Sequence, residues 1–396
     1  MVYPAPSEVA VRRLFPLLVL ALSASAAASP GKVKKARKLW AAYEGGEKSA
    51  LGEALEVLEP ALAHKKVAED PSAHALMGHL QLEVARSERS LEGLSATGAS
   101  LRKVLGMSPD DAVRADALDD LKAVQGLLLA GVEDDLAGKR LDAAWAKLEA
   151  LVSVRALLAE NKVVLRGMEE RLLRTAIIVS AQSDHLDAAL EHHEAFFGEG
   201  WFDAGLASRI ATGLAAADRA EEALAFLAPL REEFPGDARL LRAQVELYGD
   251  DNEAAVGAVD AAKERLWPSV SGALLLADLY RDLAAGDAAL EAYRQVLTLD
   301  ERHRDALVRS AVIQGARADA AQAKLDEGGL PWREKRDLRK QVATDRADAV
   351  TSLEKARELD GRDREALERL VEAYTAHGDD KAAAEAKSAL DALEAE

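Results

Sequence analysis

The sequence of 396 residues contains no cysteine. This absence excludes disulfide bonds, cysteine nucleophiles, zinc sites built on thiolates and a lipid-acylated cysteine. The sequence also lacks a phosphate-binding glycine loop and a Gly-x-Ser-x-Gly nucleophile turn. No pair of carboxylates stands out from what an ordinary helix surface would carry. The residues therefore give no evidence of catalysis, and we expect no enzyme activity, no cofactor and no metal site.

Aromatic residues make up only 4% of the chain, and the charge is strongly one-sided, with a formal net charge of −18. An acidic chain repels the phosphate backbone of nucleic acids and the head groups of anionic lipids. We therefore expect neither as a partner. A surplus of acidic residues also keeps proteins soluble, so the charge does not by itself indicate a ligand.

The residues that are abundant favour helices. Ala, Leu, Glu and Arg dominate and are strong helix formers, while β-branched residues are sparse. Short breaks divide the chain, as at 249–252 and 286–287, where glycine can end one helix and Asp or Asn can cap the next. Counting the periodic segments between such breaks predicts roughly eighteen helices, or about nine hairpins, and no strand.

Small residues recur at a fixed period. Ala189, Ala223, Ala255 and Ala289 follow one another at a period of about 34 residues, and Ala383 follows Ala349 at the same period. An internal period in this range indicates stacked repeats, each burying its apolar face against its neighbours. A small residue where two helices cross lets their backbones approach closely.

Two segments add further residues at matching positions. The run 276–280 reads Leu-Ala-Asp-Leu-Tyr, and Ala289 follows its tyrosine by nine residues. The run 370–374 reads Leu-Val-Glu-Ala-Tyr, and Ala383 follows its tyrosine at the same distance. This pattern resembles the tetratricopeptide repeat family, clearly over 203–396 and in degenerate form over 29–202. The resemblance implies an all-α, right-handed solenoid of about nine hairpins.

The alanine period breaks once. The interval from Ala289 to Ala349 matches neither one repeat nor two. The helical patterns on either side of Pro331 both look too long for an ordinary repeat. We therefore expect an enlarged hairpin around 303–359.

The family resemblance implies that the first helix of each hairpin lines a concave groove that holds polypeptides. In the hairpin at 271–285 the helical period packs Ala273, Leu276, Ala277 and Tyr280 inward, and in the last repeat it packs Leu367, Leu370, Val371 and Tyr374. The residues expected to face the groove are Leu274, Asp278, Arg281, Glu365, Glu368, Glu372 and Thr375. The glutamates would suit a basic or polar ligand, or they form a solvated face.

Titratable and aromatic residues gather between 184 and 202. His185 and His192 lie seven residues apart, so they share a helix face and could hold a metal; the alternative is that they are hydrated surface residues. His193 falls at a position where a partly buried ring is expected. Four aromatic residues follow that form either a ligand surface or core packing between hairpins: Phe196, Phe197, Trp201 and Phe202.

Two functions remain open at this point. The first is a protein-interaction adaptor or scaffold that binds polypeptides in its groove and works in the cell envelope. The second is an accessory or ligand-binding subunit of an envelope enzyme complex, using the region from His185 to Phe202.

The N-terminal segment 1–28 has the organisation of a secretory signal peptide. Arg12 and Arg13 precede the apolar run 14–22, and small residues at A-x-A spacing follow, so cleavage fits after Ala26 or Ala28. A start at Val11 would give a more usual basic region. Basic residues from Lys32 to Lys38 oppose translocation, and the alternative is an uncleaved N-terminal anchor. We expect export to the periplasm, with no integral membrane segment after cleavage.

The mature protein should begin near residue 27 or 29, because small residues at A-x-A spacing define the signal peptidase site. N-terminal sequencing of the protein from a cell-envelope fraction measures this directly. A chain that begins at Met1 or Val11 and is found in the cytoplasm would contradict the expectation of export.

Overall fold

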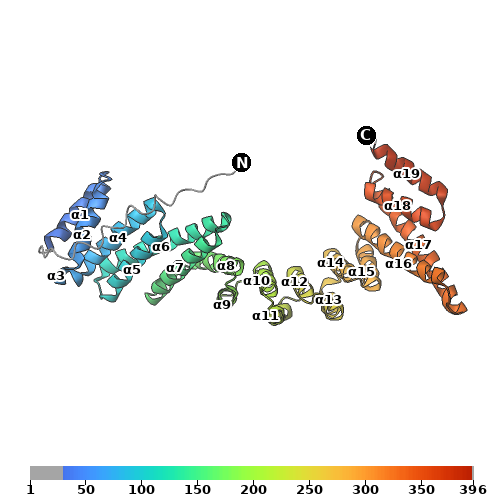
Figure 1. Cartoon of the computed structure of the whole chain (residues 1–396), viewed down its shortest axis with the longest axis horizontal. Helices are drawn as coiled ribbons and strands as arrows, with labels where there is room; N and C mark the ends of the chain where they lie inside the picture. The colour runs from blue at the N-terminus through green and yellow to red at the C-terminus, as the bar shows by residue number, and fades with distance from the viewer. Residues whose placement is uncertain (1–29, 395–396) are drawn as a thin grey trace. The chain divides into compact units, whose positions relative to one another are not determined.

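The computed structural model describes residues 30–394, which form 19 helices and no strand (Figure 1). The chain divides into two compact units, 1–199 and 200–396. The predicted signal peptide and its cleavage site lie outside the described residues. Unit 1 contains α1 (Pro30–Glu44), α2 (Ala50–Leu62), α3 (Lys65–Ala68), α4 (Pro71–Glu88), α5 (Leu91–Gly106), α6 (Asp111–Ala137), α7 (Leu141–Glu160), α8 (Arg166–Gln182) and α9 (Leu186–Gly198). Unit 2 contains α10 (Ala204–Ala216), α11 (Ala220–Glu233), α12 (Ala238–Leu247), α13 (Asn252–Leu266), α14 (Val270–Asp282), α15 (Gly286–Leu299), α16 (Arg304–Glu327), α17 (Trp332–Leu359), α18 (Arg364–His377) and α19 (Asp380–Glu394).

The helices pair into hairpins. Unit 1 holds four of them, α1–α2, α4–α5, α6–α7 and α8–α9, with the single turn of α3 between the first two. Unit 2 holds five, α10–α11, α12–α13, α14–α15, α16–α17 and α18–α19. The described part of the chain thus has nine hairpins, and in each unit consecutive hairpins pack on one another. This confirms the predicted all-α fold of stacked helical hairpins.

Acidic caps and glycine turns set several helix ends, as predicted at 249–252, where Asp251 caps α13. At 286–287 the prediction was wrong, because Gly286 and Asp287 lie inside the first turn of α15 and Ala284 makes the turn with φ of +55°. The Asp203 carboxylate accepts the backbone N–H of Gly205 at 2.8 Å, and Asp237 accepts that of Arg239 at 2.8 Å. Each side chain satisfies one of the free N–H groups at the start of its helix. At the other end of a helix, Gly378 follows α18 with φ of +87°, a conformation that glycine adopts without steric cost.

The alanines of the repeat pattern are packing residues. Ala189, Ala223, Ala255 and Ala289 have no exposed surface, and Ala349 and Ala383 are 3% and 9% exposed. In unit 2 these alanines lie on α11, α13, α15, α17 and α19, which are the second helices of their hairpins. The residues predicted to pack inward from α14 and α18 are also buried, except Val371, which is half-buried.

A tyrosine near the end of a first helix binds the preceding hairpin in two repeats. The hydroxyl of Tyr280 donates to Asp260 on α13, and that of Tyr374 donates to Glu354 on α17 at 2.6 Å. Both acceptors lie 20 residues upstream of the tyrosine. Burial and the nearby carboxylate raise the pKa of Tyr374 to about 12, so its hydroxyl keeps its proton at neutral pH.

Two hairpins are longer than the others around them. In unit 2, α16 has 24 residues and α17 has 28, in the segment where the alanine period breaks. In unit 1, α6 has 27 residues and α7 has 20, a length that the sequence analysis did not single out. Between Pro30 and Glu394 no helix is both long enough and apolar enough to span a bilayer.

Substituting Ala223 or Ala289 with leucine should lower stability by about 1–3 kcal/mol, because a fully buried position has no room for three extra carbons. Thermal or urea denaturation followed by circular dichroism measures the change. Ala225→Leu is the matched control, since Ala225 is exposed on the same helix as Ala223. If the two core variants unfold like the parent, the assigned repeat register is wrong.

Candidate functional site

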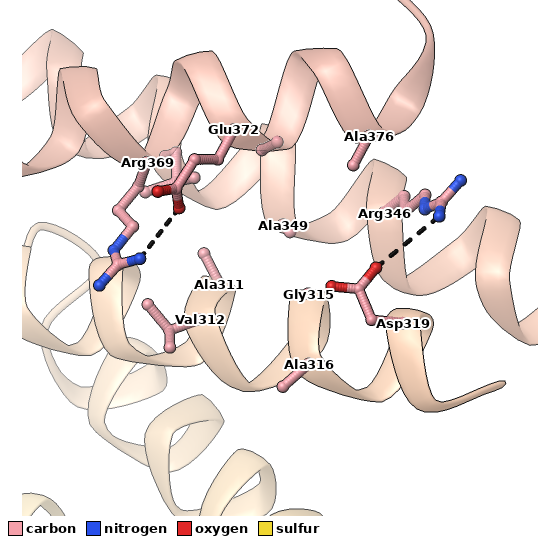
Figure 2. Close-up of a pocket in the computed structure, with 12 residues that line it drawn as sticks. Ala311, Val312, Gly315, Ala316, Asp319, Arg346, Ala349, Arg369, Glu372 and Ala376 are labelled. Atoms are coloured by element: carbon pink, nitrogen blue, oxygen red, sulfur yellow. Dashed lines mark hydrogen bonds and ion pairs between the residues drawn. The ribbon is translucent and has the colours of Figure 1, made fainter. Parts of the chain in front are cut away.

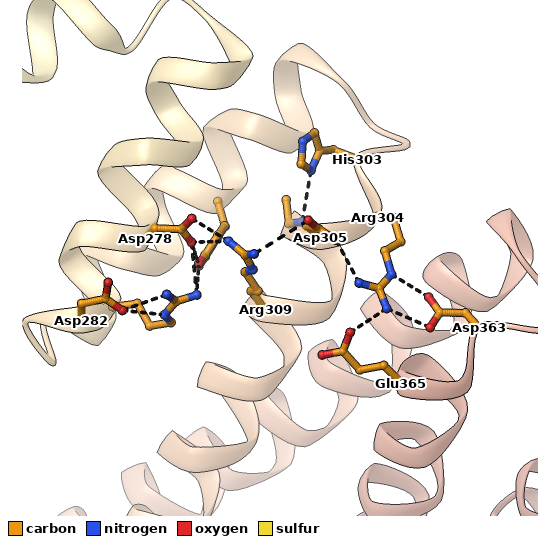
Figure 3. A network of polar contacts seen from close by, with 11 residues as sticks. Asp278, Asp282, His303, Arg304, Asp305, Arg309, Asp363 and Glu365 are labelled. Carbon is orange, nitrogen blue, oxygen red and sulfur yellow. Dashed lines mark hydrogen bonds and ion pairs between the residues drawn. The ribbon is translucent and has the colours of Figure 1, made fainter. Parts of the chain in front are cut away.

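The first helices of the last three hairpins, α14, α16 and α18, carry a connected set of charges (Figure 3). On α14, the Asp278 carboxylate accepts from the Tyr293 hydroxyl at 2.7 Å and from Arg309 of α16 at 2.6 Å. Arg281 also donates to Asp278, at 3.2 Å. Asp278 therefore ties α14 to the second helix of its own hairpin and to the first helix of the next.

Arg304 continues the set from α16 to α18. Its guanidinium donates to Asp363 through Nε at 2.6 Å, to Glu365 at 2.7 Å and to Asp305 at 2.9 Å. Asp363 is also the N-cap of α18, accepting the backbone N–H of Ala366 at 3.1 Å. The hydrogen bond from Arg304 outweighs burial and holds the pKa of Asp363 below its ordinary value, so the carboxylate stays ionised. Asp305 also lies 3.8 Å from Arg309, so three predicted groove residues, Asp278, Arg281 and Glu365, belong to one network.

Beyond this network, a pocket of about 270 Å³ lies between α16, α17 and α18 (Figure 2). Its lining includes small and apolar residues from all three helices: Ala311, Gly315, Ala349, Leu353 and Ala373. Val312 also lines it and is 41% exposed, an unusual degree for a large apolar side chain in this protein. The pocket therefore offers apolar surface to a ligand.

Two ion pairs border the pocket, as Figure 2 shows. Arg369 and Glu372 of α18 pair at 2.9 Å, and Arg346 of α17 approaches Asp319 of α16 at 3.7 Å. Of these four residues, only Glu372 was predicted from the sequence to face the groove. Residues 305, 309, 312 and 316 of α16 and residues 365, 369, 372 and 376 of α18 follow the helical period of a single face, so the network and the pocket occupy one continuous surface. We call this surface the groove face.

The predicted acidic stripe of α18 is paired with arginines. Glu365 contacts Arg304 at 2.7 Å, Glu368 contacts Arg364 at 2.7 Å, and Glu372 contacts Arg369. None of these arginine partners entered the sequence-based prediction for the glutamates. The groove face is consequently a mixed surface of both signs, and its electrostatic preference for a basic ligand is weaker than the glutamates alone suggest.

The other two predicted groove residues make local contacts. Leu274 is half-buried and packs against the core cluster around α14 and α15. Thr375 is exposed, and its hydroxyl donates to the carbonyl of Val371 at 2.7 Å, within its own helix. Neither residue is placed with the Asp278 network or among the pocket-lining residues.

Several histidine and aromatic residues near 185–202 are engaged in packing. The His185 ring stacks on Trp145 at a centroid distance of 3.6 Å, and Phe202 stacks on Phe234 at 3.8 Å. Phe196 is 1% exposed. Burial lowers the pKa of His193 to about 4, so this histidine is neutral at physiological pH. Within the described residues, no group of three metal-ligating side chains comes together.

No family model matches the chain, and no curated protein matches it. Among solved structures, one of MamA is 12% identical and covers 48% of this chain and 92% of its own, with a TM-score of 0.35. A MamA fragment from Desulfovibrio magneticus RS-1 is 16% identical over 48% of this chain and 95% of its own, with a TM-score of 0.33.

A third structure is described as "YrrB: a TPR protein with an unusual peptide-binding site". It is 15% identical and covers 49% of this chain and 88% of its own, with a TM-score of 0.32. Each of these likenesses spans about half of the present chain. The helical hairpins, the buried alanines at the repeat period and the tyrosine positions of the chain itself give it a tetratricopeptide-like repeat architecture.

Proposed function

We propose that this protein is a protein-interaction adaptor that holds a polypeptide partner on the groove face of α14, α16 and α18. The observation that carries the proposal is the pocket between α16, α17 and α18, which combines an apolar lining with charged borders. Known protein interfaces have this composition, with a central apolar anchor site surrounded by polar groups.

The size of the pocket fits side chains of a polypeptide. A volume of about 270 Å³ accommodates one or two aliphatic side chains, and Ala311, Ala349 and Leu353 provide apolar contacts for them. Burying one such side chain stabilises a complex by about 1.5–3 kcal/mol. The exposed Val312 would lose its contact with water on binding.

The charges around the pocket favour a polar partner segment of mixed sign. Arg369 and Glu372 are 44% and 66% exposed in their side chains, so both can also contact groups of a ligand. Arginine is enriched at interface positions that contribute strongly to binding, because its planar guanidinium forms several hydrogen bonds at once. Because each glutamate of α18 already pairs with an arginine, these glutamates should not make the groove face bind a strongly basic ligand more tightly than a neutral one.

We also propose that the adaptor works in the cell envelope. Support comes from the basic, apolar and small-residue regions of the N-terminal segment 1–28, which have the order of a secretory signal. If the N-terminal segment is instead retained, it would anchor the adaptor to the membrane, which is itself part of the cell envelope.

Filling the pocket tests the assignment of the groove face. Gly315 lines the pocket, and a Cβ added there would meet no atom within 4 Å, so Gly315→Leu places an isobutyl group in open space. Replacing glycine within a helix also favours the helical state, so the variant should fold at least as stably as the parent. Peptides selected from a displayed random library on the parent protein should bind this variant about tenfold more weakly.

Gly257→Leu is the matched control, because Gly257 is exposed on the second helix α13 and a Cβ there also meets no atom within 4 Å. Affinities are measured by fluorescence anisotropy, and folding is checked by circular dichroism. Equal affinity of the selected peptides for the parent, Gly315→Leu and Gly257→Leu would show that the pocket is not the binding site.

A further inference from the structure

Basic side chains gather around a second pocket, in unit 1. It has a volume of about 430 Å³ and lies between the hairpins α4–α5 and α6–α7. Two of the cations, Arg86 and Arg89, come from the end of α4, and two, Arg140 and Lys147, come from the start of α7. We call it the cationic pocket. It is remote in sequence from the groove face and has no part in the function proposed above.

A buried carboxylate positions two of these cations. Asp135 is 4% exposed and accepts a hydrogen bond from Arg140 Nε at 2.8 Å and from Lys147 Nζ at 2.6 Å. Burial alone would raise the pKa of Asp135, but the hydrogen bonds from Lys147 and Arg140 hold this pKa below its ordinary value. The carboxylate therefore stays ionised and fixes both cations at the wall of the pocket.

Two glycines make room for the same side chains. A Cβ at Gly131 would lie 3.2 Å from Cδ of Lys147, and a Cβ at Gly138 would collide with the guanidinium of Arg140. Larger residues at either position would displace the cation. The chain thus supplies both an anchoring carboxylate and the space that the two cations occupy.

The pocket is positive within an acidic protein. Four cations line it against the carboxylates of Asp134 and Asp135, which leaves an excess of two positive charges. Arg86 also pairs with Glu83, and counting that residue reduces the excess to one. An excess of this size, in a chain with a net charge of −18, suits a ligand with one or two negative charges.

The remaining lining is apolar. Ala85, Leu94, Leu127 and Ala130 contribute hydrocarbon surface next to the cations. Small-molecule sites typically occupy about 300–1,000 Å³ and combine apolar walls with a few polar groups that fix the ligand's orientation. Guanidinium groups bind planar carboxylates through paired hydrogen bonds. We propose that the cationic pocket binds a small organic carboxylate with an apolar body.

Isothermal titration calorimetry of the full mature chain with sodium octanoate tests this proposal. Octanoate should bind, and octanamide, which has the same apolar body and no charge, should not. Arg89→Asn should weaken octanoate binding by about tenfold, because a hydrogen bond to a charged group is lost. Arg89 has φ of +52°, a conformation that asparagine tolerates, so this variant should fold normally.

Lys162→Asn is the matched control. Lys162 is exposed at the opposite end of α7, has φ of +60° and loses the same charge on substitution. It should bind octanoate like the parent. Lys147→Met is a second test and should also weaken octanoate binding. Because it removes one partner of the buried Asp135, its folding is checked by circular dichroism. If Lys147→Met unfolds, Arg89→Asn alone decides the test.

Three results would overturn the proposal. The first is equal binding of octanamide and octanoate, which would make the pocket merely apolar. The second is that Arg89→Asn and Lys162→Asn lower the affinity for octanoate to the same extent, which would indicate a general effect of the protein's charge. The third is that octanoate does not bind the parent protein at millimolar concentration. This includes the outcome that peptides with acidic residues bind and octanoate does not.

Discussion

The second helix of every hairpin in unit 2 buries an alanine at the repeat position, with exposure from 0% at Ala223 to 9% at Ala383. A methyl group there lets the helices of a repeat approach closely, and the rest of the unit depends on that approach. The close approach of the helices allows Tyr280 and Tyr374 to hydrogen-bond to the preceding hairpin. It also brings the first helices close enough for Asp278 to accept a hydrogen bond from Arg309. A solenoid has no central core, so these local contacts must recur in every repeat.

The fold could be predicted from the sequence because the information is periodic and local. Alanine spacing, acidic caps such as Asp203 and turn glycines such as Gly378 act within one hairpin, and each has a known conformational effect. The long α6–α7 hairpin was not anticipated. The alanine period that reveals the break around α16–α17 begins at Ala189, so it carries no information about this earlier hairpin.

The candidate site could be predicted only in part, because its chemistry depends on contacts between hairpins. Asp278 and Arg309 are 31 residues apart, and Arg304 and Asp363 are 59 apart, so helical spacing within one element cannot reveal either pair. Glu368 and Arg364 lie four residues apart on one helix, so helical spacing alone predicts their pairing and argues against an unpaired acidic stripe. The position of Gly315 in the pocket lining could not be predicted, because a glycine beside a pocket has the same sequence pattern as any other glycine within a helix.

The link between Arg304 and Asp363 has a mechanical consequence. It joins α16 to α18 at their N-terminal ends by charge, whereas Leu307, Ala311 and Leu370 join the same hairpins by apolar packing. Salt screens exposed charges, but the Asp363 side chain is only 9% exposed, so this ion pair is screened much less. One edge of the groove face is therefore held by a directional charged contact and its floor by apolar packing. Moving α16 away from α18 would leave the Asp363 carboxylate without its partner and would expose the apolar side chains, so both contacts favour the same spacing of the last two hairpins.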